Sequence, residues 1–172
     1  MCIRDRGQRV MEAFLEEQLG IPPGSYVLHN GSGLNDVNRV SARQVVALLR
    51  HMWARFDVRA DFVSSLAVAG SDGTVDGRFE HPALSRTLRV KTGGLHNVRA
   101  LAGYAANRTG QVYAFALLVN NYSCRGGQVN RVIDRFASAL ASSDADLRIM
   151  RTLDMAPGPQ PPSGQAKTAA SN

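Results

Sequence analysis

The tripeptide Lys91-Thr92-Gly93, followed by Gly94 and Leu95, combines residue types that suit the binding of a carboxylate. The lysine ammonium supplies positive charge, and the threonine hydroxyl can donate a hydrogen bond to a carboxylate oxygen. The two glycines leave the backbone bare, so an extended peptide can lie against it as an added strand. A tripeptide of this kind also arises by chance, and the alternative interpretation is a strand end with a solvated lysine.

Lysine is scarce in this chain, which gives Lys91 more weight. Of the 20 basic residues, 18 are arginine, and Lys91 and Lys167 are the two lysines. Arginine would fill any plain surface role at position 91. A lysine amine is a compact charge whose pKa can shift, and arginine cannot replace it in proton-coupled chemistry. Lys91 is therefore a candidate site residue.

The elements that must position this tripeptide follow from hydrophobic periodicity. Apolar residues recur at helical spacing in four segments, which predict helices at Arg9 to Leu19, Ala42 to about Phe56, Asp61 to about Val68 and Gln128 to about Ala141. Ser41 is expected to cap the second helix. Apolar residues at strand spacing predict three strands, at Leu88 to Lys91, Val98 to Ala106 and Val112 to Asn120.

The order of these elements predicts the fold class. Thr109-Gly110 separates the last two strands, as an antiparallel hairpin requires. Helices therefore precede a three-strand meander, and one helix follows it. This order predicts an α+β fold, with helices packed on an antiparallel sheet.

Three segments, in this order along the chain, resemble motifs of one enzyme family. Asn30-Gly31-Ser32-Gly33-Leu34 resembles the DGSGLS segment of the penicillin-binding D-alanyl-D-alanine carboxypeptidases/endopeptidases of the low-molecular-mass class C type. The segment AGSDGT at 69–74 resembles their AGxDGT turn. Lys91 to Leu95, with Val98 and the LAGY segment at 101–104, is similar to their KTG strand and the strand that follows it. The resemblance covers about residues 9 to 141. It implies the C-terminal part of the transpeptidase domain that these proteins share with serine β-lactamases.

The resemblance also implies a mechanism and roles for residues. In this family a serine of an S-x-x-K motif attacks the D-Ala-D-Ala carbonyl, an S-x-N motif assists proton transfer, and KTG binds the terminal carboxylate. Lys91 would be catalytic, and the substrate-binding residues would be Thr92, Gly93, Gly94, Leu95, Ser32, Gly33 and Leu34. The implied partners are peptidoglycan stem peptides and β-lactams, in the periplasm or cell envelope, with no cofactor. The chain departs from the family at Gly94, where Ser or Thr is usual, at Asn30 in place of Asp, and at Asn35 in place of Ser.

Two of the family's motifs are missing from the chain. The residues three positions before the two lysines are Leu88 and Gly164, and no asparagine has a serine two positions before it. We therefore expect a C-terminal fragment, inactive alone, whose nucleophile and signal peptide lie upstream. Residues 1–8 are interpreted as a leader foreign to the domain, 9–150 as part of the penicillin-binding domain, and 151–172 as a disordered tail rich in Pro, Ala and Ser.

The charge leaves an alternative open. The net charge of +6 would also suit a noncatalytic basic domain that binds an anionic polymer or nucleic acid. The arginines are scattered from Arg4 to Arg151 and aromatic residues make up only 6% of the chain, so we favour a solvated surface and expect no nucleic-acid partner. A fragment of a related serine β-lactamase, which shares KTG but not the other two motifs, is a third reading.

Metal and membrane functions find no support in the sequence. The four histidines have no metal-ligand spacing, so no metal site is predicted. Asp72 is expected to form a turn rather than to act as a catalytic acid. The longest apolar run, Val112 to Val119, is far shorter than the ~20 residues that a membrane-spanning helix needs.

Overall fold

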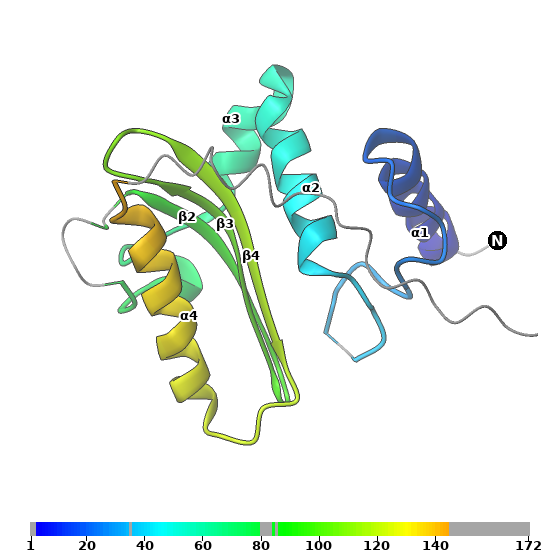
Figure 1. Ribbon diagram of the computed structural model, residues 1–172. Coiled ribbons are helices and arrows are strands. Elements are labelled where there is room, and N and C mark those ends of the chain that lie inside the picture. The colour runs from blue at the N-terminus through cyan, green and yellow to red at the C-terminus, as the bar shows by residue number, and fades with distance from the viewer. Residues whose placement is uncertain (1–2, 35, 80–83, 85, 145–172) are drawn as a thin grey trace, which may run out of the picture.

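The computed structural model describes residues 3–34, 36–79, 84 and 86–144. Within this part the strands form one antiparallel sheet in the order β1 (Ala67–Val68), β2 (Leu88–Leu95), β3 (Val98–Ala106) and β4 (Val112–Asn120). Helix α4 (Gly126–Ala141) covers one face, and α2 (Ala42–Ala54) and α3 (Phe56–Ser64) lie on the other (Figure 1). Helix α1 (Ile3–Ala13), which continues as a π-helical segment over Phe14–Gln18, lies beyond α2. The predicted α+β fold is confirmed.

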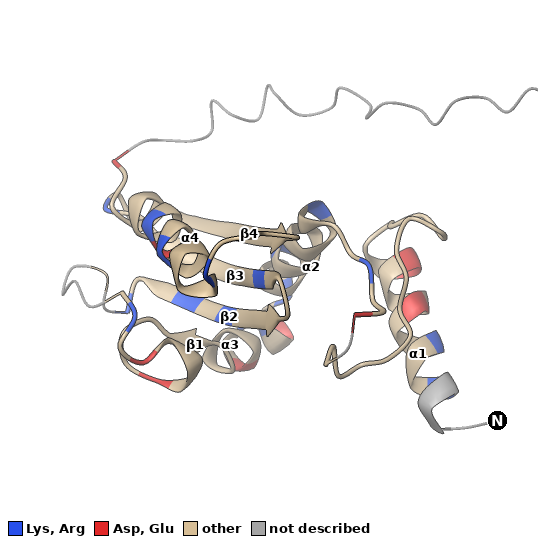
Figure 2. Ribbon diagram, turned by 90° about the horizontal axis from the view of Figure 1, so that it is seen from below, with Lys and Arg blue, Asp and Glu red and all other residues tan. Residues whose placement is uncertain are grey.

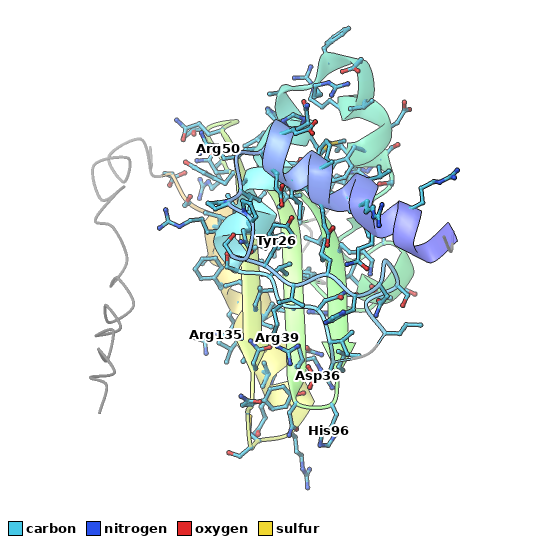
Figure 3. All side chains as sticks on the ribbon, turned by 90° about the vertical axis from the view of Figure 1, so that its right-hand side faces the viewer. Tyr26, Asp36, Arg39, Arg50, His96 and Arg135 are labelled. Atoms are coloured by element: carbon cyan, nitrogen blue, oxygen red, sulfur yellow. The ribbon has the colours of Figure 1, made fainter. Side chains whose placement is uncertain are left out.

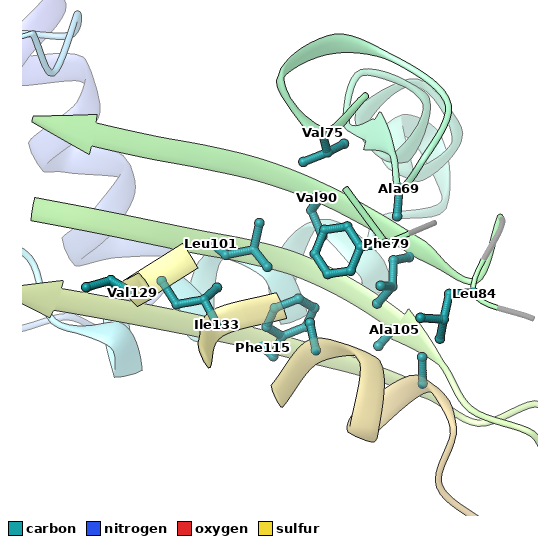
Figure 4. Close-up of a cluster of buried hydrophobic side chains, with 13 residues drawn as sticks. Ala69, Val75, Phe79, Leu84, Val90, Leu101, Ala105, Phe115, Val129 and Ile133 are labelled. Carbon is teal, nitrogen blue, oxygen red and sulfur yellow. The ribbon is translucent and has the colours of Figure 1, made fainter. Parts of the chain in front are cut away.

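The larger core lies between the sheet and α4. Val90, Leu101, Ala105 and Phe115 point from the three long strands toward one stripe of α4 (Figure 4), and Leu88 is buried in the same cluster. That stripe consists of Val129, Ile133, Ala137 and Ala141, a spacing of four residues that keeps the side chains on one side of a helix. The segment between β1 and β2 closes the core with Val75, Phe79 and Leu84.

The opposite face of the sheet holds α2 through a second cluster. Tyr104 of β3 is buried against Leu49 of α2 and Leu66, which follows α3. Tyr104 and Leu101 lie on opposite faces of β3 because side chains alternate along a strand. The same alternation assigns the residues of β2: Leu88 and Val90 face α4, whereas Arg89 and Lys91 face the side of α2.

Gly103 allows β2 and β3 to pair closely. It lies opposite Val90 in the register, and a Cβ atom at this position would lie 2.0 Å from the Arg89 carbonyl oxygen. That contact is impossible, so any side chain here would push β2 away from β3. The glycine therefore fixes the position of the strand that carries the candidate site.

The start of α2 is as expected. Ser41 accepts a hydrogen bond from the Gln44 amide, and the Gln44 side chain accepts one from the Ser41 amide, which completes a capping box. Strands β3 and β4 also have the predicted bounds. These three elements carry strong local signals, because the sequence itself shows a capping serine before α2 and apolar runs bounded by turn residues at β3 and β4.

The prediction of a helix from Asp61 to about Val68 was wrong. Helix α3 begins at Phe56, after Arg55 adopts an extended conformation and pairs with Asp57. The helix ends at Ser64, and the backbone of Ala67 and Val68 pairs with Val90 and Arg89 instead. Pairing with β2 thus replaces the last helical turn that we had predicted.

Several element ends also differ from expectation. Strand β2 continues four residues past Lys91, to Leu95, because every one of these residues pairs with β3. Helix α2 ends at Ala54, α4 begins at Gly126, and α1 begins at Ile3, so the expected leader is helical from that residue on. The foreign origin of the leader stays a prediction, and the expected tail at 151–172 lies outside the described residues.

Candidate active site at the edge of the sheet

The candidate tripeptide lies in the second half of β2. Lys91, Thr92 and Gly93 pair with Ala102, Leu101 and Ala100 of β3. On the other side of β2, the short strand β1 pairs only with Arg89 and Val90. In the described part of the chain, the outer edge of β2 from Lys91 to Leu95 therefore has no neighbouring strand. Such an edge can accept an extended peptide through backbone hydrogen bonds.

Lys91 is exposed beside this edge. Its ammonium group donates a hydrogen bond to the Thr92 carbonyl oxygen over 2.7 Å. The side chain thus folds along its own strand and leaves its remaining N–H donors available, since an ammonium carries three. A carboxylate at the edge of β2 would meet this positive charge.

The two glycines of the site differ in the space around them. A Cβ on Gly93 would lie 3.2 Å from the Ala100 Cβ, which is a tight contact. A Cβ on Gly94 would lie 3.6 Å from Nη1 of Arg99, which is ordinary van der Waals distance. Both glycines are exposed, so the backbone between them is open to a ligand.

Arg99 braces the end of the β2–β3 hairpin, a role that the sequence did not suggest. Its guanidinium donates hydrogen bonds to the carbonyl oxygens of Leu95 and Val98, over 2.8 and 2.7 Å, and lies over the Tyr122 ring. It also approaches Gly126 so closely that a Cβ there would meet Nη2 at 2.5 Å. Gly126, which leaves room for the Arg99 guanidinium, is the one sequence signal of this contact.

The AGSDGT segment forms a turn beside β2, as expected. Asp72 acts as a turn former, because its Oδ1 accepts the Val68 amide proton over 2.7 Å. Gly70 and Gly73 both have positive φ, which glycine adopts without strain. The turn brings the Thr74 hydroxyl to 2.5 Å from the Thr92 hydroxyl. Two of the three resembling motifs are therefore in direct contact.

The Ser32-Gly33-Leu34 loop is shaped by Asn30. Its Oδ1 atom accepts hydrogen bonds from the Gly33 amide over 2.9 Å and from the Ser32 hydroxyl over 3.1 Å. Gly33 has a φ of +65°, which suits the turn that these bonds close. The Asn38 side chain holds the base of the loop, through bonds to the His29 amide and the Asn30 carbonyl.

A hollow of about 380 Å³ brings this loop and the end of β2 together. Gly33 lines it from the loop and Leu95 from the strand, while Leu118 and Asn120 of β4 form part of its wall. Asp36, Arg39 and His96 also line it and gather near one end of the sheet (Figure 3). The predicted residues Ser32 and Leu34 are exposed beside it, with 80% of Leu34 accessible to solvent.

The charges do not form a single patch. Basic side chains are distributed over helices and strands with acidic ones between them (Figure 2). Within the described ranges, no group of three His, Cys, Asp or Glu side chains is arranged to hold a metal ion. Among these residues, no helix has the length and apolarity needed to cross a membrane.

Comparison with known proteins identifies the family. Residues 4–140 match the D-Ala-D-Ala carboxypeptidase 3 (S13) family. The chain is 33% identical over 119 residues to the D-alanyl-D-alanine carboxypeptidase DacB of Haemophilus influenzae, covering 68% of this chain and 24% of that protein. It is 34% identical over 114 residues to the D-alanyl-D-alanine carboxypeptidase of Actinomadura sp. strain R39, covering 61% of this chain and 20% of the relative.

Comparison with solved structures leads to the same family. The crystal structure of penicillin binding protein 4 from Haemophilus influenzae superimposes with a TM-score of 0.69 at 27% identity, over 80% of this chain and 32% of that one. The endopeptidase Bd0816 of Bdellovibrio bacteriovorus, at 23% identity and a TM-score of 0.65, shares the fold. The chain spans about a quarter of the length of the curated relatives it matches. The resemblance read from the three motifs is confirmed, and the chain belongs to the D-Ala-D-Ala carboxypeptidase 3 (S13) family.

Proposed function

We propose that this chain is the carboxylate-binding part of a serine-type D-alanyl-D-alanine carboxypeptidase/endopeptidase that acts on peptidoglycan stem peptides. The observation that carries the proposal is the open edge of β2 with Lys91 and Thr92 beside it. A stem peptide would add to this edge as an extended strand. Its terminal carboxylate would meet the Lys91 ammonium and the Thr92 hydroxyl, whose hydrogen bonds to a charged acceptor are stronger than neutral ones.

The reaction would be acyl transfer through a covalent intermediate. A serine hydroxyl attacks the carbonyl of the penultimate D-alanine, the C–N bond breaks, and the terminal D-alanine leaves with a proton on its nitrogen. Water then hydrolyses the acyl-enzyme and restores the serine. We propose that the serine and its lysine come from segments outside this chain, because neither lysine here has a serine three residues before it.

The hollow between Gly33 and Leu95 would receive a side chain of the stem peptide. It lies on the side of the sheet from which Lys91 projects, at the end of β2 where Leu95 lines it. Ser32 and Leu34 would form the outer wall of this subsite. A β-lactam would occupy the same edge, since it also presents a carboxylate and a reactive carbonyl. The site of action would be the periplasm or cell envelope, where peptidoglycan is located.

A hybrid enzyme tests this proposal. Residues 4–144 would replace the matching segment of the Haemophilus influenzae carboxypeptidase, and a fluorescent penicillin would report covalent labelling. We expect the hybrid to be labelled, the Lys91→Ala hybrid to be labelled far more slowly, and the 172-residue chain alone to remain unlabelled. A folded hybrid that is not labelled would contradict the proposal. Labelling of the chain alone would contradict the claim that the nucleophilic serine comes from a segment outside this chain. Circular dichroism of each hybrid would establish that it is folded.

A further inference from the structure

The hydroxyl groups of Thr74 and Thr92 lie 2.5 Å apart, although 18 residues separate them in the sequence. This distance is at the short end of the range for O–H···O hydrogen bonds. One hydroxyl must therefore donate its proton to the other. Thr92 is half-buried and Thr74 is exposed, so the pair lies at the surface beside the open edge of β2.

The turn that carries Thr74 is firmly attached to β2. Val75, the next residue, is completely buried in the core together with Val90. The Gly70 amide donates a hydrogen bond to the Val75 carbonyl oxygen, and Asp72 accepts one from the Val68 amide. Strand β1, directly before the turn, pairs with β2 at Val90. These contacts fix the Thr74 hydroxyl relative to Thr92.

The direction of the hydrogen bond determines what Thr92 can do. A threonine hydroxyl has one proton to donate and can also accept. If Thr92 donated its proton to Thr74, none would remain for a substrate carboxylate. If Thr74 donates, the Thr92 oxygen accepts and its own proton is free for the carboxylate. Consecutive hydrogen bonds, from Thr74 to Thr92 and from Thr92 to the carboxylate, polarise one another, which makes the Thr92 hydroxyl a better donor.

We propose that Thr74 is a positioning residue that holds the Thr92 hydroxyl in one rotamer and orients its proton toward the substrate carboxylate. This inference rests on the proposed function. It assigns a role to the AGSDGT turn, namely discrimination of a free carboxylate from an amide at the end of the peptide. Thr74 acts through Thr92 and does not itself contact the carboxylate.

The test uses nuclear magnetic resonance of the 172-residue chain. Three-bond couplings report the Thr92 rotamer in the wild-type chain and in Thr74→Val, Thr74→Ser and Ser71→Ala. Ser71 is an exposed hydroxyl in the same turn, so its substitution is the matched control. Titration with N-acetyl-D-alanyl-D-alanine, and with the same peptide ending in a carboxamide, reports binding at the Thr92 signals.

We expect one Thr92 rotamer in the wild type, Thr74→Ser and Ser71→Ala, and rotamer averaging in Thr74→Val. Thr74→Val should weaken binding of the acid peptide by about fivefold, the scale of one hydrogen bond, and leave binding of the carboxamide peptide unchanged. In a Thr92→Val background, Thr74→Val should add nothing, because the two residues act as one unit.

A single Thr92 rotamer in Thr74→Val would overturn the inference. So would an equal loss for both peptides, or additive effects of the two valine substitutions. The proposed function fails separately: a wild-type chain that binds both peptides equally would contradict carboxylate binding at Thr92. The rotamer measurement would still decide whether Thr74 positions Thr92.

Discussion

The Tyr104 hydroxyl of β3 donates a hydrogen bond to the Leu49 carbonyl oxygen of α2 over 2.6 Å, across the interface between the sheet and the helix. The tyrosine is almost completely buried, and the centroid of its ring lies 5.1 Å from the centroid of the Trp53 ring. This contact attaches α2 to the face of the sheet from which Lys91 projects. Because the loop with Gly33 leads into α2, the same contact helps to place the loop beside Leu95.

Substitution of Tyr104 by Phe should reduce the free energy of unfolding by about 1 kcal/mol, since it removes one buried hydrogen bond and leaves the ring in place. Urea denaturation followed by circular dichroism measures this change. Tyr122→Phe is the control, because Tyr122 is only half-buried and lies against Arg99 through its ring. Equal stability of Tyr104→Phe and the wild type would show that the hydroxyl does not hold α2.

The stability of the protein should fall at alkaline pH. Burial raises the pKa of Tyr104 to about 12, and the hydrogen bond to Glu16 raises the pKa of Tyr26 to about 12. Because both pKa values exceed the tyrosine value of 10.0 in the unfolded chain, this contribution is complete below pH 10 and is lost as the pH rises toward 12. Denaturation midpoints measured from pH 8 to 12 should show this loss. The loss should be smaller in Tyr104→Phe and in Tyr26→Phe, and an unchanged pH dependence in both variants would contradict the assignment.

Three glycines near the site should respond differently to alanine. Gly103→Ala should destabilise the protein by about 3 kcal/mol or more, because its Cβ would overlap the Arg89 carbonyl oxygen. Gly93→Ala should cost about 1 kcal/mol, since the Ala100 methyl group must move by a few tenths of an ångström. Gly94→Ala should leave stability unchanged, because its Cβ meets only ordinary contacts. Urea denaturation of the three variants gives the order, and a stable Gly103→Ala would contradict the register of β2 and β3.

Gly94→Ser tests the departure from the family at this position. The serine Cβ fits beside Arg99, and the hydroxyl would lie on the same side of β2 as Thr92, two residues away. We expect the substitution to accelerate acylation of the hybrid enzyme by penicillin about fivefold, through one more donor to the carboxylate. Gly94→Ala is the control without the hydroxyl. Equal rates for the two variants would show that this position does not contact the carboxylate.

The charge and the compact shape of Lys91 should both contribute to acylation. Lys91→Ala should slow acylation of the hybrid by about 100-fold, and Lys91→Arg by about tenfold, because arginine keeps the charge but not the shape of the ammonium. Neither substitution should change the urea midpoint, since Lys91 is exposed. An acylation rate in Lys91→Ala equal to that of the wild-type hybrid would assign Lys91 to a plain surface role.

Asn30 should be replaceable by Asp but not by Ala. The loop uses the Asn30 Oδ1 atom as an acceptor, and a carboxylate offers the same acceptor to the Gly33 amide. Hydrogen exchange of that amide should therefore stay slow in Asn30→Asp and become fast in Asn30→Ala. Ser32→Ala is the control, because it leaves the bond between Asn30 and Gly33 intact. Fast exchange already in the wild type would contradict the closed loop.

Local signals explain which parts of the fold the sequence predicted. Strands β3 and β4 are rich in apolar residues and are separated by a turn that contains Thr109-Gly110, so their bounds were predicted correctly. Strand β1 consists of two residues and has no periodic signal; it exists only because Val90 and Arg89 offer backbone partners. Helix α3 begins directly after the extended backbone of Arg55, a break that hydrophobic periodicity does not report.

The contacts around the candidate site could not be predicted from the sequence, and the roles of its residues stay predictions. The resemblance identified the three segments, and the structure brings Thr74 into contact with Thr92 and Gly33 into one hollow with Leu95. The hydrogen bond between Thr74 and Thr92 and the bracing role of Arg99 depend on how the turn and the hairpin pack, which no local pattern encodes. Gly33 and Leu95 share a hollow only because α2 and its preceding loop pack on the sheet.

Release of D-alanine by the hybrid enzyme is the most direct test of the central claim, that β2 of this chain binds the substrate carboxylate. The assay compares a peptide ending in D-Ala-D-Ala with the same peptide ending in a carboxamide, for the wild-type hybrid and for Lys91→Ala. We predict rapid cleavage of the acid peptide alone by the wild type, and loss of that preference in Lys91→Ala. Equal cleavage of the two peptides by the wild-type hybrid, or an undiminished preference in Lys91→Ala, would contradict the claim.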